Sequence, residues 1–505
     1  MLETVRLVGR GLQQKAALWD GRRVIDWLQT RRLRCLIAHA KSRSPFYAER
    51  LRQINPDRFR LEDLPPITKT ELMEHFDDVV TDRRLKLRDL EAFMSDPQRL
   101  GQWYLGEYAV SRTSGTQGVQ AVIVQNRRMM ELLFALQMTR GTVFPTTPWG
   151  IVLRLFQRVR LAVITIGRGF FPSAAALAYA PKASRRFVKR LWLQDIEPLE
   201  EVVARLNRFR PQVLLAYANV LVILAREALA GRLILPDLRQ VINMSEPLSD
   251  GARALISRAF GLPVTNNYAL GECMALTTGC PRGIGMHVQA DWAILEVVDK
   301  NYRPVPPGQP GDKVLVTNLY NTVQPFIRYE VNDVVTLSPS ACPCGSPLPL
   351  VLHVEGRTDE VLWIRVGDRY KLLHPYVLVD FLDEYPPVGW YQIIQTERNR
   401  FLLRAQPAPK RTVSPEELRQ VIERGLKHYH LDGLLQFDIE ITDQVAPDPR
   451  SGKLRRITSR VGPPADLSEE ERLLAEQSAA SDPHFPLGQA GLTPSAPVSE
   501  NRGAA

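Results

Sequence analysis

A segment rich in Gly, Ser and Thr, residues 110–124 (VSRTSGTQGVQAVIV), contains the first residues that could do chemistry. A turn of this composition between two extended runs can present backbone N–H groups and hydroxyls to phosphate oxygens. The candidates are Ser114, Gly115, Thr116 and Gly118. The GKS or GKT ending of a P-loop NTPase is missing, so that class of site is disfavoured. An ordinary hairpin turn is an equal alternative, since short glycine patterns match by chance.

Two later segments, MSEPLS at 244–249 and NNYALGECM at 266–274, add an aromatic ring and carboxylates. A ring beside a backbone turn can stack on a purine, and a nearby carboxylate can hold Mg²⁺ bound to phosphate oxygens. Tyr268 is the candidate ring and Glu272 the candidate carboxylate. Taken alone, a residue such as Tyr268 is more often a core aromatic, and one such as Glu272 is more often a solvated loop charge.

The segment VTNLYNTVQPFIRYEVNDVV, residues 316–335, places Arg328 and Asp333 five residues apart. An Asp at the end of a strand can accept both ribose hydroxyls of a nucleotide. The alternative is a surface Arg–Asp pair. Further along, GRTDE (356–360) contributes Arg357, and SGKLRR (451–456) contributes Lys453 after the last expected strand.

Four residues could bind a metal ion. Cys280 and His287 lie seven positions apart, and Cys342 and Cys344 follow later in a CPCG turn. Three thiolates and one imidazole are a typical tetrahedral zinc set, although a CxC turn alone is a weak signal. The alternative is three free thiols and a hydrogen-bonded histidine.

The elements that must position these residues follow from periodicity. Helix-like apolar spacing covers 22–43 and 47–77, with Ser44 as a helix start signal. From about 108 to 352, β-rich runs alternate with helical stretches, which predicts an α/β domain. We expect a helical part at 1–107, an α/β core at 108–354 and a small α+β lid at 355–462. The composition of 463–505, rich in Ala, Pro, Ser and Gly, predicts a disordered tail.

Composition restricts the class of protein. The chain has 505 residues, 45% of them hydrophobic, enough for at least two domains. The net charge of +10 arises from Lys and Arg dispersed among 55 acidic residues, so it gives no support for a nucleic-acid binder. The N-terminus lacks the pattern of a secretory signal, and residues 213–230, although apolar, carry Asn219, Arg226 and Glu227 and fit a buried helix better than a membrane span. A cytoplasmic location is therefore expected.

The order of these motifs identifies a family resemblance. A phosphate-type loop, then YALGE, IRYEVND, GRTDE and finally SGK closely resemble the signature motifs of the adenylate-forming superfamily, which includes acyl-CoA synthetases and adenylation domains. The segments SPFYAERL, LPPITKTEL, GCPRGIGMHVQAD and CPCG resemble the phenylacetate–CoA ligase and CapK-like branch. The resemblance extends to about residue 460 and implies a large α/β domain with a mobile C-terminal lid.

The resemblance also implies a reaction and roles for the candidates. The expected activity is ATP- and Mg²⁺-dependent activation of a carboxylic acid, aromatic acids included, as acyl-AMP, followed by transfer to coenzyme A. Lys453 would stabilise the adenylation transition state, with Arg357 assisting at the ribose or phosphate. The other implied contacts are Ser114, Gly115, Thr116 and Gly118 with the phosphates, Ser245, Glu246 and Pro247 with the adenine, Tyr268 on the purine, Glu272 with Mg²⁺ and Asp333 with the ribose. Arg328 is included among the nucleotide-binding candidates, Asp359 matches the hinge, and related cysteines support a structural zinc ion.

Some positions depart from the family pattern. Gln117, Val119 and Gln120 stand where relatives usually carry Thr, Lys and Pro, so one cation near the phosphates is missing, and Arg112 is the residue that could compensate. The run 365–383 replaces the glycine-containing loop that approaches the thiol cofactor in phenylacetate ligases. Transfer to an amine, a hydroxyl or a carrier protein therefore remains open, as do a non-catalytic nucleotide-binding role and a homodimer.

Overall fold

The computed structural model describes residues 2–113, 120–141, 158–165, 170–194, 197–244, 246, 248, 250–357, 362–367, 369–373, 378, 381–382, 385, 387–408, 411–428, 431–446 and 456–461. Its contacts divide the chain into two units. Unit 1 comprises Met1–Asp359 and Ala446–Leu454, and unit 2 comprises Glu360–Val445 and Arg455–Ala505. The expected tail at 463–505 lies outside the described residues.

Unit 1 begins with helices. They are α1 (Leu2–Trp19), α2 (Arg22–Arg43), α3 (Pro45–Arg50), α4 (Lys69–Glu74), α5 (Phe76–Val79) and α6 (Leu87–Met94), with 3₁₀ turns η1 (Leu61–Asp63) and η2 (Pro97–Arg99). The helix predicted at 22–43 and the start signal at Ser44 are confirmed, since the Ser44 side chain accepts a hydrogen bond from Tyr47 N. The continuous helical pattern predicted over 47–77 is wrong. Helix α3 ends at Arg50 and α4 begins at Lys69, and Pro56, Pro65 and Pro66 lie between them. Proline removes a backbone donor and disfavours helix at the preceding residue.

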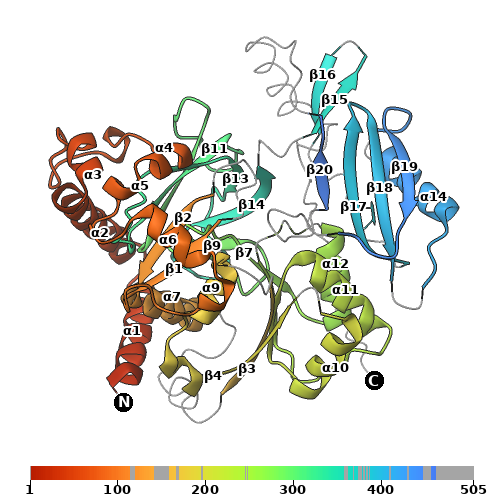
Figure 1. Ribbon diagram of the computed structural model, residues 1–505, viewed down its shortest axis with the longest axis horizontal. Helices are drawn as coiled ribbons and strands as arrows, with labels where there is room; N and C mark the ends of the chain where they lie inside the picture. The colour runs from red at the N-terminus through yellow and green to blue at the C-terminus, as the bar shows by residue number, and fades with distance from the viewer. Residues whose placement is uncertain are drawn as a thin grey trace, which may run out of the picture. The chain divides into compact units, whose positions relative to one another are not determined.

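The centre of unit 1 is a parallel five-stranded sheet in the order β4-β3-β5-β6-β7. Its strands are β3 (Val159–Thr165), β4 (Val188–Gln194), β5 (Val213–Ala216), β6 (Gln240–Met244) and β7 (Val264–Asn267). The intervening helices are α9 (Pro172–Ala178), η3 (Lys182–Arg186), α10 (Leu199–Phe209), α11 (Ala218–Leu229) and α12 (Asp250–Phe260). Figure 1 shows α10, α11 and α12 together on one side of this sheet. The predicted α/β class is confirmed.

Three further sheets are formed by the described residues of unit 1. The hairpin β1 (Tyr108–Arg112) and β2 (Val122–Asn126) is followed by α7 (Arg127–Arg140). A second sheet has the order β10-β11-β12, with β10 (Ala293–Val298), β11 (Lys313–Asn318) and β12 (Tyr329–Val331). A third, antiparallel sheet has the order β13-β14-β9-β8, with β8 (Thr277–Gly279), β9 (Met286–Val288), β13 (Asp333–Leu337) and β14 (Leu350–Arg357). In the chain, the Gly/Ser/Thr segment joins β1 to β2, and Asp333 begins β13.

Unit 2 has a core of its own. It contains the hairpin β15 (Leu362–Val366) and β16 (Arg369–Leu373), and a mixed sheet β19-β18-β17-β20. The strands of the sheet are β17 (Val388–Glu397), β18 (Arg400–Pro407), β19 (Gln436–Ile441) and β20 (Ile457–Ser459), and helix α14 (Pro415–His428) packs against it. Figure 1 shows α14 alongside β19.

The apolar stretch 213–230 folds as strand β5 followed by helix α11, rather than as one helix. Tyr217 separates the two elements and adopts an extended backbone conformation. Across the described residues, none of the helices combines the length and the apolar character that crossing a membrane requires.

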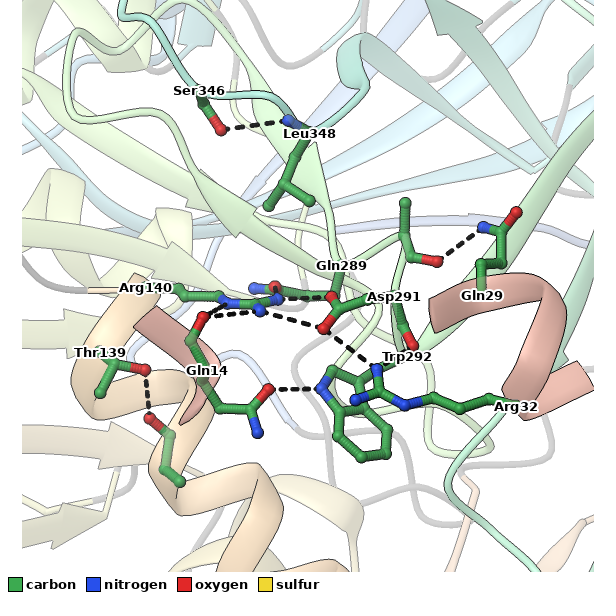
Figure 2. A network of polar contacts seen from close by, with 12 residues as sticks. Gln14, Gln29, Arg32, Thr139, Arg140, Gln289, Asp291, Trp292, Ser346 and Leu348 are labelled. Carbon is green, nitrogen blue, oxygen red and sulfur yellow. Dashed lines mark hydrogen bonds and ion pairs between the residues drawn. The ribbon is translucent and has the colours of Figure 1, made fainter. Parts of the chain in front are cut away.

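A buried polar network joins the N-terminal helices to the loop before β10 (Figure 2). Asp291 accepts hydrogen bonds from Arg140 Nη1 and Nη2, at 2.6 and 3.0 Å, and from Arg32 Nη1 at 3.1 Å. Arg140 also donates to the Gln14 carbonyl oxygen at 2.9 Å, and the Gln14 side chain accepts from Trp292 Nε1 at 2.6 Å. Arg32 of α2 and Arg140 of α7 therefore bind the Asp291 carboxylate directly, and Gln14 of α1 is connected to it through Arg140.

Candidate active site

The carboxyl ends of two neighbouring parallel strands lead into two of the predicted motifs. Glu246 follows β6, and Tyr268 follows β7. Asn243 connects the two ends, because its Nδ2 donates to the Glu246 carbonyl oxygen at 2.7 Å and to Asn266 Oδ1 at 2.8 Å. In open parallel sheets, ligands bind at this edge. Ser245 and Pro247 lie outside the described residues.

Two reciprocal hydrogen bonds join YALGE to RYEVND. Tyr268 Oη donates to Asp333 Oδ2 at 2.6 Å, and Tyr329 Oη donates to Glu272 Oε1 at 2.7 Å. In each motif a tyrosine lies four residues before the carboxylate that the other motif's tyrosine contacts. All four residues are buried. The two carboxylates are therefore oriented by rigid neighbours from different segments of the chain.

The main chain around these residues is also fixed. Thr277 Oγ1, at the start of β8, donates to the Tyr268 carbonyl oxygen and accepts from Tyr268 N. Asn318, at the end of β11, donates from Nδ2 to the Glu272 carbonyl oxygen at 2.7 Å. Such contacts reduce the freedom of the site before a ligand binds, and preorganisation of this kind favours tight positioning.

Gly271 brings YALGE close to the predicted phosphate loop. A Cβ added there would lie 2.8 Å from Ile123 Cδ1, 2.9 Å from Pro172 Cγ and 3.2 Å from Thr113 Cγ2. A residue with a Cβ at this position would require one or more of these side chains to shift. Thr113 N donates to the Ala121 carbonyl oxygen, and Ala121 N donates to Thr113 Oγ1, both at 2.9 Å, so the two ends of the loop are joined. Ser114, Gly115, Thr116 and Gly118 lie between them, outside the described residues.

Arg328 occupies a different environment from the one expected. Its Nε and Nη2 donate to both carboxylate oxygens of Glu296, at 3.1 and 3.0 Å, and Nη1 donates to the Leu64 carbonyl oxygen at 2.6 Å. The residue is buried and has a φ of 47°, an uncommon left-handed conformation. The alternative of a surface Arg–Asp pair is wrong, because Arg328 pairs with Glu296 instead. Its contacts fix the segment that leads into Tyr329.

The remaining catalytic candidates are described only in part. Arg357 ends β14, and its backbone lies directly opposite Asp333 on β13. Lys453 and Asp359 lie outside the described residues.

The four predicted metal ligands come together. The donor atoms of Cys280, His287, Cys342 and Cys344 all lie within 4.8 Å of one another. A zinc ion about 2.3 Å from each sulfur in tetrahedral geometry would separate two sulfurs by about 3.8 Å. Cys280 Sγ and Cys342 Sγ are 3.7 Å apart, close to that separation and too far for a disulfide. This donor set fits zinc.

The histidine in this cluster is oriented as a ligand. His287 Nδ1 lies 3.3 Å from the Leu348 carbonyl oxygen, which assigns the ring proton to Nδ1, and Nε2 lies 3.2 Å from Cys344 Sγ. Burial lowers the pKa of His287, although hydrogen bonds to Leu348 and Pro349 oppose the shift, so the neutral ring is favoured. Burial raises the pKa of the Cys344 thiol to about 12 without a metal, and a bound cation would reverse that effect.

Several contributors to the site were missed by sequence reasoning. Tyr329 carried a usable signal, since it precedes Asp333 by the same four positions that separate Tyr268 from Glu272. Thr277, Asn318 and the close approach of Gly271 carried none, because they depend on contacts between distant segments.

Comparisons with known proteins show what the chain is similar to. No protein-family model matches the chain. It is 27% identical over 385 residues to phenylacetate-coenzyme A ligase of Thermus thermophilus, covering 73% of this chain and 77% of the relative. It is 24% identical over 327 residues to protein CapK of Staphylococcus aureus, covering 61% and 62%.

A solved structure of 2-hydroxyisobutyryl-CoA ligase, in the postadenylation state in complex with R3-HIB-AMP, superposes with a TM-score of 0.63 at 20% identity, over 91% of this chain and 92% of that one. At this level of identity the likeness establishes the fold. Together with the similarity to phenylacetate-coenzyme A ligase and CapK, the shared fold confirms the predicted resemblance of this chain to the adenylate-forming superfamily.

Proposed function

We propose that the protein is an ATP-dependent adenylate-forming ligase that activates a carboxylic acid as its acyl-AMP and transfers the acyl group to coenzyme A. The observation that carries this proposal is the reciprocal pairing of Tyr268 with Asp333 and of Tyr329 with Glu272, beside the ends of the Gly/Ser/Thr loop. The names of the relatives support it, since two of them are coenzyme A ligases.

In this proposal the nucleotide binds at the carboxyl edge of β6 and β7. The Tyr268 ring stacks on the purine, and the Asp333 carboxylate, held by the Tyr268 hydroxyl, accepts the ribose hydroxyls. Ser114, Gly115, Thr116 and Gly118 are the proposed phosphate contacts, and the segment 245–247 is proposed to line the adenine. Arg328 contributes by holding the backbone of RYEVND through Glu296 rather than by contacting the ligand.

The reaction proceeds in two displacements at this site. A carboxylate oxygen of the acid attacks the α-phosphorus of ATP. The bond between the α-phosphorus and the oxygen that bridges it to the β-phosphorus breaks, and pyrophosphate leaves with that oxygen and its electron pair. Lys453 and Arg357 stabilise the added negative charge in the transition state. The thiolate of coenzyme A then attacks the acyl carbon, and AMP leaves as the second product.

Magnesium fits the buried carboxylate of Glu272, which provides the oxygen ligand that this ion prefers. When bound, the ion would neutralise charge on the phosphates. The protein's own part is to hold the carboxylate in place, through Tyr329 Oη on its side chain and Asn318 Nδ2 on its carbonyl oxygen.

Unit 2 serves in this proposal as the lid, with Asp359 at the hinge, the position at which the chain passes from unit 1 to unit 2. The four-residue Cys/His cluster holds a structural zinc ion. A cytoplasmic location accompanies these assignments, because the cluster needs reduced thiols.

Transfer of the acyl group to an amine, a hydroxyl or a carrier protein is the second candidate function, favoured by the altered run at 365–383.

ATP–pyrophosphate exchange tests the first step, with aromatic, short hydroxylated, aliphatic and amino acids as substrates. We expect exchange with one class of acid, lost in Lys453→Ala and reduced at least about tenfold in Asp333→Asn. The exposed Asp57→Asn is the matched control and should retain full activity. Release of AMP that requires coenzyme A identifies the acceptor. ATP binding without exchange for any acid would replace this proposal with the non-catalytic alternative.

A further inference from the structure

The outward side of the first two helices combines apolar and basic residues. On α1, Val5, Leu12 and Trp19 recur every seven residues and are 64%, 42% and 63% exposed. On α2, Arg23, Trp27, Arg31 and Arg34 follow one another at helical spacing, and all four are exposed. We refer to these seven residues as the outer face.

The inner sides of both helices are already occupied. Gln14 of α1 and Arg32 of α2 reach the buried network around Asp291 and Trp292 (Figure 2). Ala17 and Ile25 pack together against Ala290 and Leu348. Trp19 and Trp27 each follow one of these two core residues by two positions, which turns them to the opposite side of their helices. The outer face is therefore held rigidly with both tryptophans directed away from the core.

The charge of the chain is concentrated in the same two helices. Residues 1–43 contain ten Lys and Arg but three Asp and Glu, a net +7, while the other 462 residues contain 55 and 52. Within the described residues, Arg23, Arg31, Arg34 and Arg43 form no ion pair, and Arg31 lies over the Trp27 ring at 5.4 Å. Arg6 and Arg10 pair with Glu131, and Arg32 pairs with Asp291, so the exposed excess of positive charge comes from the other arginines. A second copy of the chain would bring the same excess of positive charge to this surface. The partner that complements it is acidic.

We propose that the outer face binds the surface of an anionic lipid membrane. Trp and Leu side chains enter the boundary between headgroups and acyl chains, while arginines contact acidic headgroups, as in helices that lie in the plane of a membrane. An apolar row on α1 would have no role on a nucleic acid, so lipid fits both components of the surface. This binding would place the proposed ligase at a membrane without a spanning helix.

Sedimentation of the full chain with vesicles tests the inference. We expect binding to phosphatidylcholine vesicles that contain about 30% phosphatidylglycerol, weakening as salt rises, and little binding to phosphatidylcholine alone. Trp19→Ala with Trp27→Ala should lower the partition coefficient by about tenfold or more. Arg23→Gln, Arg31→Gln and Arg34→Gln together should remove the preference for the anionic lipid.

The matched control replaces two exposed apolar residues elsewhere, Leu229→Ala with Ile234→Ala, which are 50% and 63% exposed. This variant should bind vesicles like the unmodified chain, and circular dichroism should show that all variants are folded. Equal losses in the control and the tryptophan variant would overturn the inference, as would failure of the unmodified chain to sediment. A dimer that the tryptophan substitutions dissociate, without vesicle binding, would assign the outer face to self-association instead.

Discussion

Asp291→Asn should destabilise unit 1 far more than any substitution of a surface ion pair. The Asp291 carboxylate has no solvent exposure, and the Arg140 side chain is 1% exposed. Removing the charge leaves the Arg140 guanidinium buried with only the neutral oxygens of Gln289 and Gln14. Loss of one partner from a buried ion pair costs about 3–5 kcal/mol, because the other charge is left uncompensated.

Asp237→Asn is the matched control for this prediction. Asp237 also pairs with two arginines, Arg160 and Arg210, each at 3.0 Å, but its side chain is 35% exposed. Exposed pairs contribute about 0–1 kcal/mol. Urea unfolding followed by tryptophan fluorescence, with circular dichroism to separate the two units, measures both free energies. A cost for Asp291→Asn as small as that of the control would refute the role assigned to the network.

The same carboxylate predicts a pH dependence. Burial by itself raises the pKa of Asp291, but the hydrogen bonds and charge of Arg140, with the charge of Arg32, outweigh it and hold the pKa below its ordinary value. The contribution to stability is therefore complete above the unfolded pKa of about 3.9 and is lost as the pH falls through the folded pKa. The difference between Asp291→Asn and the unmodified protein should shrink below about pH 4. A difference that grows as acid is added would contradict this sign.

Three further changes test the site. Tyr268→Phe removes the hydroxyl that holds Asp333, and the KM for ATP in the exchange assay should rise about tenfold with a smaller change in kcat. Gly271→Ala places a methyl group 2.8 Å from Ile123 Cδ1, so exchange should fall at least about tenfold as the turn moves away from the phosphate loop. Metal analysis should find about one zinc ion per chain, and Cys344→Ser should lower both the zinc content and the melting temperature.

Each of these changes has a counterpart elsewhere in the chain. Tyr385→Phe removes a hydroxyl that contacts the exposed carboxylate of Glu417, and should leave the KM unchanged. Gly9→Ala adds a methyl group where no atom lies within 4 Å, and should be neutral or stabilising. Cys35→Ser alters an exposed free thiol, and should keep the zinc content. If a control variant loses as much activity, ATP affinity or zinc as the site variant it is paired with, then that site variant acts through general destabilisation.

Local sequence patterns predicted the parts of the fold that depend on local interactions. The start of α3 at Ser44 and the whole of α2 follow from spacing and from a capping side chain. The break in the helical pattern between Arg50 and Lys69 could also have been predicted from the residues alone, since Pro56, Pro65 and Pro66 lie within it. The Cys/His cluster was predictable because few arrangements other than a metal site bring those residue types together.

Contacts between distant segments could not be predicted in this way. Arg328 was included among the nucleotide-binding candidates of the IRYEVND motif, and its observed partner, Glu296, lies 32 positions away on β10. The positive charge was considered dispersed, although residues 1–43 hold most of the excess. The sequence does not show which of these residues are exposed. Trp19 and Trp27 are exposed, and they provide an apolar surface beside the arginines.

The Cys/His cluster and the candidate active site share one sheet, and this has a physical consequence. Strand β8 begins at Thr277, which holds both main-chain polar groups of Tyr268, and Cys280 follows its last residue. Strand β13 begins at Asp333, and the turn with Cys342 and Cys344 connects it to β14. A metal ion bound by these ligands therefore joins the ends of the same strands that place Tyr268 and Asp333 within hydrogen-bonding distance. Loss of the metal ion should loosen the ends of these strands and thereby weaken nucleotide binding. The hydrogen bonds of Tyr268 to Asp333 and of Tyr329 to Glu272 should remain.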